Sequence, residues 1–282
     1  MNDRDAVAKA AEAGAATQPD AVVQVDGLRV FTDDGRTLVD DLSFTVGAGE
    51  RFGLIGESGS GKSLTALALL GLLPDGLRAS GSIIVGGRQA AGADERTLRG
   101  IRGRVASVVF QDPLASLDPL MRLGRQLAEP IARHQGLRGK ALAAAVLDAM
   151  ADVRLGDPER IAAAYPHEIS GGQRQRVAIA MALACQPRLL IADEPTTALD
   201  VTVQSDVLDL IDRAVTERGT SLLFVSHDLA VVSRMTDRVV VLRGGRAVES
   251  GTIAGLLAHQ DDPYTAELVA SARSLDRALE AS

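Results

Sequence analysis

The stretch GESGSGKS, residues Gly56 to Ser63, decides the fold. It matches the pattern G-x-x-x-x-G-K-S in full, an apolar run (Phe52 to Ile55) precedes it, and a strongly helical segment (Ser63 to Leu73) follows it. A strand, a glycine-rich loop and a helix in this order open a nucleotide-binding α/β unit. The glycines let backbone N–H groups surround phosphates, and the helix N-terminus adds positive potential. We therefore expect this loop to bind a nucleoside triphosphate.

Each polar residue of the loop has an expected task. The ammonium of Lys62 meets the β- and γ-phosphates, and the hydroxyl of Ser63 binds Mg²⁺. Lysine is rare in this chain, since Lys9 and Lys140 are its only other lysines. The loop residues expected to contact the nucleotide are Gly56, Glu57, Ser58, Gly59, Ser60, Gly61, Lys62, Ser63 and Leu64.

A second element, LLIADEP (Leu189 to Pro195), supplies carboxylates. Its apolar residues predict a buried strand that delivers Asp193 and Glu194 at its carboxyl end, where ligands of open α/β sheets bind. Asp193 is expected to hold Mg²⁺ through water, and Glu194 to orient and polarise the attacking water. An acidic pair can also simply end a strand, but its occurrence after a phosphate loop favours catalysis.

The chain has no Asn-Lys-x-Asp motif of the kind that recognises the guanine base of a nucleotide, because Asn2 is its only asparagine. Adenine can instead stack on an aromatic ring, and Phe31 ends a predicted strand upstream of the loop. The alternative for Phe31, an ordinary core phenylalanine, is the less favoured one.

Composition limits the class of protein. Of the 282 residues 46% are hydrophobic, and 30 Lys plus Arg against 37 Asp plus Glu give a net charge of −7, which argues against nucleic acid as a general partner. The single Cys185 excludes an intramolecular disulfide and suits a reducing compartment. The cleanest apolar run, Val177 to Cys185, is about half of what a bilayer crossing needs, and the N-terminus does not resemble a signal peptide. We expect a cytoplasmic protein that another chain holds at any membrane.

Hydrophobic patterning divides the chain. Residues 1–20 are polar and Ala-rich and predict a disordered tail. Strand patterns run from Ala21 to Val46 and return at Leu189 to Ala192, Leu222 to Val225 and Val239 to Leu242, the last before a hairpin turn at Gly244-Gly245. Between Gln111 and Ser170 the spacing is helical, and prolines predict several short helices. The two expected apolar faces are Leu120, Leu123, Leu127 and Ile131, and Leu142, Val146, Met150 and Val153; the prolines are Pro113, Pro119, Pro130 and Pro166.

The segment YPHEISGGQRQRVAIAMAL, Tyr165 to Leu183, completes a set of motifs that resembles the ATP-binding subunits of ABC transporters. ISGGQ is similar to the family's signature, commonly written LSGGQ. In the family this signature opens a helix that acts in trans, on the ATP held by a second subunit, so the resemblance implies a head-to-tail dimer. The signature residues are Ser170, Gly171, Gly172 and Gln173.

Further motifs of this family occur in the expected order along the chain. The resemblance implies that Gln111 reaches Mg²⁺ and the attacking water, that His227 senses the γ-phosphate, and that Asp200, in Ala198-Leu199-Asp200, lies at the dimer seam. It also implies an α/β fold: a P-loop NTPase (RecA-like) core over residues 21–255, with an N-terminal antiparallel β subdomain and a helical insertion at about 112–180. Residues 256–282 would form a short C-terminal helical extension.

A narrower match, in TTALDVT and VFQDPLASLDP among others, resembles the D-type ATPase of peptide and nickel importers. Longer members continue after a PYT segment, here Pro263-Tyr264-Thr265, into a cysteine-bearing tail; without such cysteines no iron–sulfur cluster is expected. The implied cofactors are ATP and Mg²⁺. The implied partners are a second, F-type ATPase, two permease subunits and an extracytoplasmic solute-binding protein, and the implied location is peripheral, on the cytoplasmic face of the inner membrane.

Two alternatives remain open at this point. One is the ATPase of an exporter, which the motifs do not exclude. The other is a soluble ABC-type ATPase acting on DNA or ribosomes, which the short helical stretch and the single copy of each motif disfavour. For a transporter, the stretch Pro113 to Ile131 is expected to receive a permease helix, although ordinary core packing explains any one residue equally well. The candidate contacts are Leu114, Leu117, Leu120 and Met121.

Overall fold

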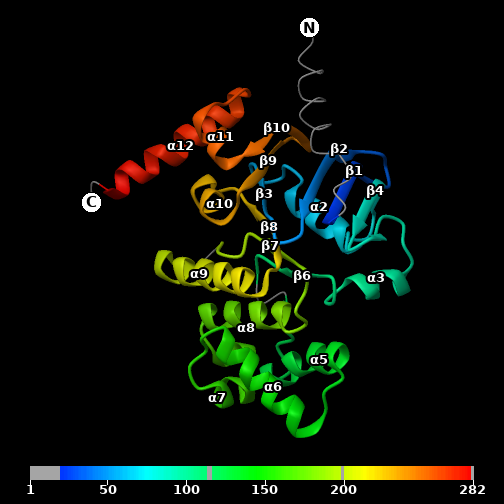
Figure 1. The fold of residues 1–282 in the computed structure, drawn as a ribbon, viewed down its shortest axis with the longest axis vertical. Helices are drawn as coiled ribbons and strands as arrows, with labels where there is room; N and C mark the ends of the chain where they lie inside the picture. Colours follow the sequence, from blue (N-terminus) through cyan, green and yellow to red (C-terminus); the bar gives the residue numbers. More distant parts are fainter. Residues whose placement is uncertain (1–19, 113–115, 198–199, 281–282) are drawn as a thin grey trace. The chain divides into compact units, whose positions relative to one another are not determined.

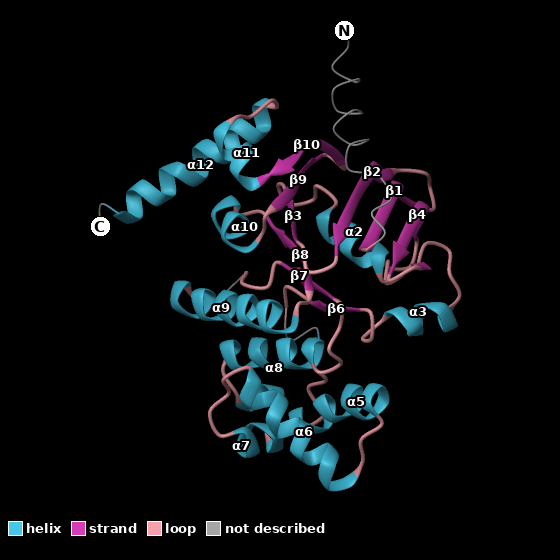
Figure 2. Ribbon diagram, in the orientation of Figure 1, coloured by secondary structure: helices cyan, strands magenta, loops and turns pink. Residues whose placement is uncertain are grey.

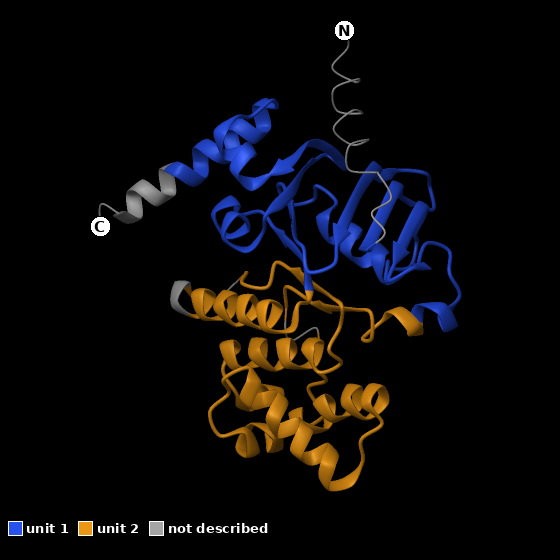
Figure 3. Ribbon diagram, in the orientation of Figure 1, with its two compact units in different colours: residues 1–98, 221–282 blue, residues 99–220 orange. Residues whose placement is uncertain are grey.

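The computed structural model describes residues 20–112, 116–197 and 200–280, and the chain divides into two compact units (Figure 3). One unit comprises Met1–Leu98 and Ser221–Ser282, and the other comprises Arg99–Thr220. Nearly all of the predicted tail, together with Leu114, Ala198 and Leu199, lies outside the described residues.

An antiparallel sheet of four strands forms part of the first unit, in the order β2-β1-β4-β5 (Figures 1 and 2). Every valine of β1 is buried, and the alternation of buried and exposed residues shifts at a bulge where Gly27 has a φ of +58° and donates its N–H to Ser43 Oγ. This sheet is the predicted N-terminal antiparallel subdomain. Its strands are β1 (Ala21–Thr32), β2 (Thr37–Gly47), β4 (Leu77–Val85) and β5 (Arg88–Gln89).

Strand β3 (Arg51–Ile55) pairs in parallel with β8 (Ser221–Ser226) on one side and with β9 (Arg238–Arg243) on the other. All residues of β8 are buried, as the prediction of strands apolar on both faces requires. Strand β10 (Arg246–Thr252) returns antiparallel to β9. Gly244 and Gly245 join these two strands with φ angles of +54° and +83°, which confirms the predicted hairpin turn.

The helices of the first unit follow its strands. Helix α2 ends before Leu73, the last residue of the predicted helix, because Gly71 adopts a left-handed φ of +60° and Leu72 N–H donates back to Leu67 O. The other helices are α10 (Leu229–Met235), α11 (Ile253–Ala258) and α12 (Pro263–Glu280); α2 is Lys62–Leu69, and α3 (Glu95–Ile101) spans the boundary between the units in sequence.

The second unit contains two parallel strands and a set of helices. Short helices replace one long helix, as predicted, but Pro130 lies inside α5 and does not end it. The predicted apolar faces are buried at Leu123, Leu127, Ile131, Val146, Met150 and Val153. Leu142 is only half-buried, and Leu120 is 87% exposed because it precedes α5 in a turn. The elements are β6 (Ala106–Val109), α5 (Leu123–Gln135), α6 (Gly139–Asp152), α7 (Pro158–Ala163), η1 (Pro166–Glu168), α8 (Gly171–Leu183), β7 (Leu189–Asp193) and α9 (Val201–Arg218).

Candidate functional site

The predicted phosphate loop is the turn between β3 and α2. Gly56 allows the loop to lie close to β9, since a Cβ at this position would be only 2.1 Å from the carbonyl oxygen of Leu242. Gly59 has a φ of +81°, and a Cβ there would meet nothing within 4 Å, so this side of the loop is open. The loop is thus packed against the strands on one side and accessible to a ligand on the other.

Lys62 begins α2 and folds back over the loop. Its side chain is buried, and its Nζ donates hydrogen bonds to Gly56 O at 2.8 Å and to Glu57 O at 2.9 Å. Ser63, the next residue, is exposed. No described residue accepts a hydrogen bond from the backbone N–H of Gly59 or Gly61. An ammonium inside the curve of an open loop with available N–H groups fits nucleotide phosphates.

His227 follows β8 and is exposed. Because Ile55 of β3 and Ser226 of β8 are register partners in a parallel pair, the phosphate loop and His227 leave the sheet at the same edge. The next residue, Asp228, caps α10 through a hydrogen bond from Ala230 N–H to its Oδ1 at 2.9 Å, which fixes the turn that carries the histidine.

Phe31 lies near the end of β1, between Thr37 of β2 and Arg78 of β4. The ring is only half-buried, whereas its neighbour Val30 is fully buried. A half-exposed aromatic side chain is compatible with stacking on a base and less typical of a core residue.

In the second unit, β6 and β7 form a parallel pair with Val109 opposite Ala192. Gln111 therefore leaves this pair at the same edge as Asp193 and Glu194, as the predicted roles require. Asp193 is 7% exposed at the end of its strand.

Glu194 has a left-handed φ of +47°, which is uncommon for a residue with a side chain. The turn that holds it is closed by Thr197, whose Oγ1 donates to Glu194 Oε2 at 3.0 Å and whose N–H donates to Glu194 O at 3.2 Å. Such conformations persist where the surroundings fix them, and they cluster at active sites.

The predicted signature forms the N-terminus of α8. Ser170 is the N-cap: its Oγ accepts a hydrogen bond from Gln173 N–H at 3.3 Å, and its N–H donates to Gln173 Oε1 at 3.1 Å. A Cβ on Gly172 would lie 2.9 Å from Val203 Cγ1 of α9, so this glycine permits close helix packing. The cap engages the N–H groups of Ser170 and Gln173, which leaves those of Gly171 and Gly172 to meet an anion.

Asp200 is exposed and caps α9, with its Oδ1 accepting from Val203 N–H at 2.9 Å. The two preceding residues of the predicted seam, Ala198 and Leu199, lie outside the described part of the chain.

Two contacts of these segments were not predicted from the sequence. The fully buried Gln175 of α8 donates from Nε2 to Pro195 O at 2.7 Å, which ties the signature helix to the turn after β7. Tyr264 of α12 accepts a hydrogen bond from Glu57 N–H of the phosphate loop at 2.7 Å. The only sequence signal for the second contact was the PYT segment, which carries no indication of its tertiary partner.

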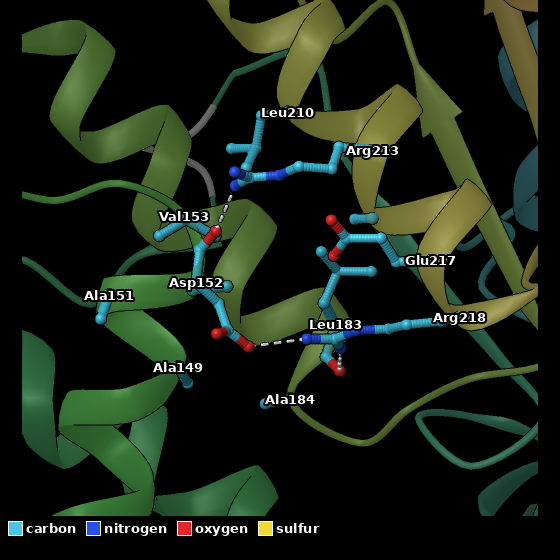
Figure 4. Close-up of a pocket in the computed structure, with 12 residues that line it drawn as sticks. Ala149, Ala151, Asp152, Val153, Leu183, Ala184, Leu210, Arg213, Glu217 and Arg218 are labelled. Atoms are coloured by element: carbon cyan, nitrogen blue, oxygen red, sulfur yellow. Dashed lines mark hydrogen bonds and ion pairs between the residues drawn. The ribbon is translucent and has the colours of Figure 1, made fainter.

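A pocket of about 270 Å³ in the second unit lies among α6, α8 and α9 (Figure 4). Arg213 donates to Asp152 O at 2.8 Å, and Arg218 donates to Asp152 Oδ2 at 2.8 Å and to Leu183 O at 3.0 Å. Since both guanidinium groups already tie α9 to its neighbours, we interpret them as structural. None of the predicted site residues lines this pocket.

Comparisons with known proteins agree with these motifs. The model of the ABC transporter family matches residues 39–197. The oligopeptide transport ATP-binding protein OppD of Salmonella typhimurium is 45% identical over 93% of this chain and 79% of its own length. The peptidoglycan transport ATP-binding protein YejF of Agrobacterium fabrum is 45% identical over 90% of this chain and 47% of its own.

Among solved structures, the dimeric post-hydrolysis state of the ATP-binding cassette MJ0796 bound to ADP and Pi has a TM-score of 0.73 and 26% identity, and the match covers 83% of this chain and 99% of that one. The fold is therefore the predicted P-loop NTPase fold with an antiparallel β subdomain. The chain belongs to the ABC transporter family, as one of its ATP-hydrolysing, ATP-binding cassettes.

Proposed function

We propose that this chain is the ATP-hydrolysing subunit of an ABC importer for peptides or peptide-like solutes. The observation that carries the proposal is the 45% identity to OppD over 93% of the chain, with every ATPase motif present. The name of YejF adds peptidoglycan-derived solutes to the candidates. Both relatives are transport proteins similar over nearly the whole chain, which favours a transporter over the soluble DNA or ribosome ATPase. Import is favoured over export because a further relative, from Brucella ovis, is 44% identical over 92% of this chain and has a name that specifies peptide import.

The residues then have these roles. Lys62 and the loop N–H groups bind the phosphates of ATP, and Phe31 stacks on adenine. Ser63, Gln111 and Asp193 would hold Mg²⁺, which when bound offsets the charge of the β- and γ-phosphates. The hydroxyl, amide and carboxylate oxygens of these three residues are the donors that this hard cation prefers.

Glu194 positions and polarises the attacking water, because its carboxylate is held by Thr197 beside Asp193. His227 senses the γ-phosphate from the edge at which the phosphate loop lies. The N-terminus of α8, Ser170 to Gln173, acts on ATP held by a second cassette, and Asp200 lies at the seam with that cassette.

The proposed partners are an F-type second ATPase, two permease subunits and an extracytoplasmic solute-binding protein. The chain would lie peripherally on the cytoplasmic face of the inner membrane. Of the candidate permease contacts, Leu117 is buried and belongs to the core, Leu120 is exposed, and Met121 is half-buried. Leu120 is therefore the best placed of the three to meet a permease.

The test of catalysis is the variant Glu194→Gln. We expect ATP binding, measured by calorimetry, to stay close to that of the wild type, while phosphate release falls at least about 100-fold because the water is no longer activated. Glu129→Gln, the same change at an exposed position of α5, is the matched control and should hydrolyse ATP normally. Normal turnover by Glu194→Gln would refute the role of this residue, and normal ATP affinity of Lys62→Ala would refute the phosphate loop.

The substrate class has a separate test. In the reconstituted importer, ATP hydrolysis should be stimulated by the solute-binding protein loaded with peptide. Stimulation by a nickel-loaded binding protein alone would replace the peptide proposal with nickel import.

A further inference from the structure

Helix α12 reaches the phosphate loop through one side chain. Tyr264 is 7% exposed, and its hydroxyl accepts the hydrogen bond from Glu57 N–H at 2.7 Å. Glu57 is the second residue of the loop, and its N–H is one of the backbone groups of the turn. A residue near the C-terminus of the chain thus binds the backbone of the loop that we propose to hold ATP.

Tyr264 is held in place by several contacts. The guanidinium of Arg243, at the end of β9, lies over its ring at 4.8 Å from the centroid. Before the helix, the carboxylate of Glu249 accepts hydrogen bonds from the N–H groups of Asp261 and Asp262, each at 3.2 Å, and Asp262 Oδ1 accepts from Tyr264 N–H at 2.8 Å. The strands β9 and β10 therefore fix the turn that presents the tyrosine.

The hydroxyl is suited to the role of an acceptor. Burial raises the pKa of Tyr264 above its ordinary value, so the side chain is a neutral phenol at physiological pH. A neutral hydroxyl accepts the N–H of Glu57 without adding a negative charge next to a loop that must receive phosphates.

The contact bears on Lys62 as well. The two carbonyl oxygens that hold the Lys62 ammonium are those of Gly56 and Glu57, on either side of the N–H that Tyr264 binds. Gly56 O belongs to the same peptide group as this N–H, and Glu57 O to the next one, so holding the N–H fixes the first oxygen directly and restrains the second through the backbone of Glu57. We propose that Tyr264 is a positioning residue of the ATP site, which holds the start of the phosphate loop, and with it Lys62, in the geometry that binds phosphate. The proposal rests on the proposed role of the phosphate loop.

The test is Tyr264→Phe, which keeps the ring under Arg243 and removes only the hydroxyl. The loss of one neutral hydrogen bond predicts a KM for ATP about three- to tenfold higher, with kcat within about twofold of the wild type, because the interaction acts in binding. Thr265→Val is the matched control: it removes a buried hydroxyl that has no partner among the described residues, at the adjacent position, and should leave KM unchanged.

A purely structural role makes a different prediction. Tyr264→Phe would then lower the midpoint of thermal unfolding and the active fraction, seen as a lower kcat, and would leave the KM for ATP where it was. An unchanged KM would overturn the proposal.

A second variant tests the same contact from a distance. Glu249→Ala removes the acceptor for Asp261 and Asp262, and it should raise KM in the same direction. Because both changes act through one hydrogen bond, KM of the double variant should exceed that of Tyr264→Phe by less than about twofold. If the two increases in KM multiplied fully in the double variant, the two residues would act independently, and this coupling would be contradicted.

The failure of this inference can be told apart from failure of the proposed function. If Lys62→Ala binds ATP as tightly as the wild type, the phosphate loop itself has been assigned wrongly. If Lys62→Ala loses ATP binding and Tyr264→Phe keeps the wild-type KM, only the proposed role of Tyr264 is refuted.

Discussion

Three carboxylate residues show that the same kind of side chain can serve structure or chemistry. The difference depends on its position at the end of a strand or at the start of a helix. Asp228 and Asp200 accept backbone N–H groups and cap α10 and α9. Glu194, in contrast, follows a buried strand in a left-handed conformation, with its carboxylate bound by Thr197. The caps stabilise helices, whereas Glu194 occupies a conformation that costs stability and is the better candidate for catalysis.

Cys185 gives a prediction at this scale that depends on pH. Burial raises the pKa of its thiol to about 11, and the thiolate is the form that reacts. In the native protein we expect the rate of alkylation by iodoacetamide to keep rising about tenfold per pH unit from pH 7 to about pH 10. In the urea-unfolded chain the rate should level off above about pH 9, where an exposed thiol is already ionised.

Since Cys185 is the only cysteine, the whole alkylation signal belongs to it. A native rate that levels off near pH 9 would show that the thiol is not shielded as the structure indicates.

At the scale of helices and strands, the sequence predicts those elements that a local hydrophobic or turn pattern is enough to determine. The strands β3, β7, β8 and β9 are short and largely apolar on both faces, and the Gly244-Gly245 turn consists of two residues that adopt left-handed φ angles without a steric penalty. Gln111 and His227, in contrast, were predicted from the resemblance to the family, and the structure shows that each follows a strand of a parallel pair.

The features that were missed depend on contacts distant in sequence. The hydrogen bond from Glu57 to Tyr264 and the bond from Gln175 to Pro195 follow from tertiary packing, which no periodicity reports. Leu120 fits the spacing of the buried face of α5, but the helix begins only at Leu123, so the pattern was extended one turn too far. Pro130 stays inside α5, where buried Leu127 and Ile131 on either side hold the helix in place.

The packing of α8 on α9 gives a prediction for two adjacent glycines. Gly172→Ala should lower the free energy of unfolding by about 1–2 kcal/mol, because the added Cβ would lie 2.9 Å from Val203 Cγ1, and a β-branched side chain has little freedom to move away. Gly171→Ala is the control, since a Cβ there meets nothing within 4 Å, and its effect should stay within about 0.5 kcal/mol.

Urea unfolding without nucleotide measures both variants, so that binding does not contribute. Equal stabilities of the two would mean that α8 and α9 are packed less closely than described.

For the molecule as a whole, the described part of the chain contains no helix long and apolar enough to cross a membrane. For the proposed contact with a permease, exposed apolar side chains are the candidates. Among the described residues, Leu72 and Leu120 are the large apolar side chains that stand exposed, at 36% and 87%. Leu120 lies in the turn before α5, within the stretch expected to receive the permease, and Leu72 follows α2.

The different positions of these two exposed leucines give the last prediction. Leu120→Asp should reduce the amount of permease that co-purifies with the tagged chain from detergent-solubilised membranes at least about tenfold, since a charge replaces an apolar anchor of the interface. ATP hydrolysis by the purified chain should stay within about twofold, because Leu120 belongs to none of the proposed nucleotide contacts. Leu72→Asp makes the same change at the other exposed leucine and should leave co-purification intact. Equal loss in both variants would point to a general effect of an added charge, and no loss in Leu120→Asp would move the permease contact elsewhere on the surface.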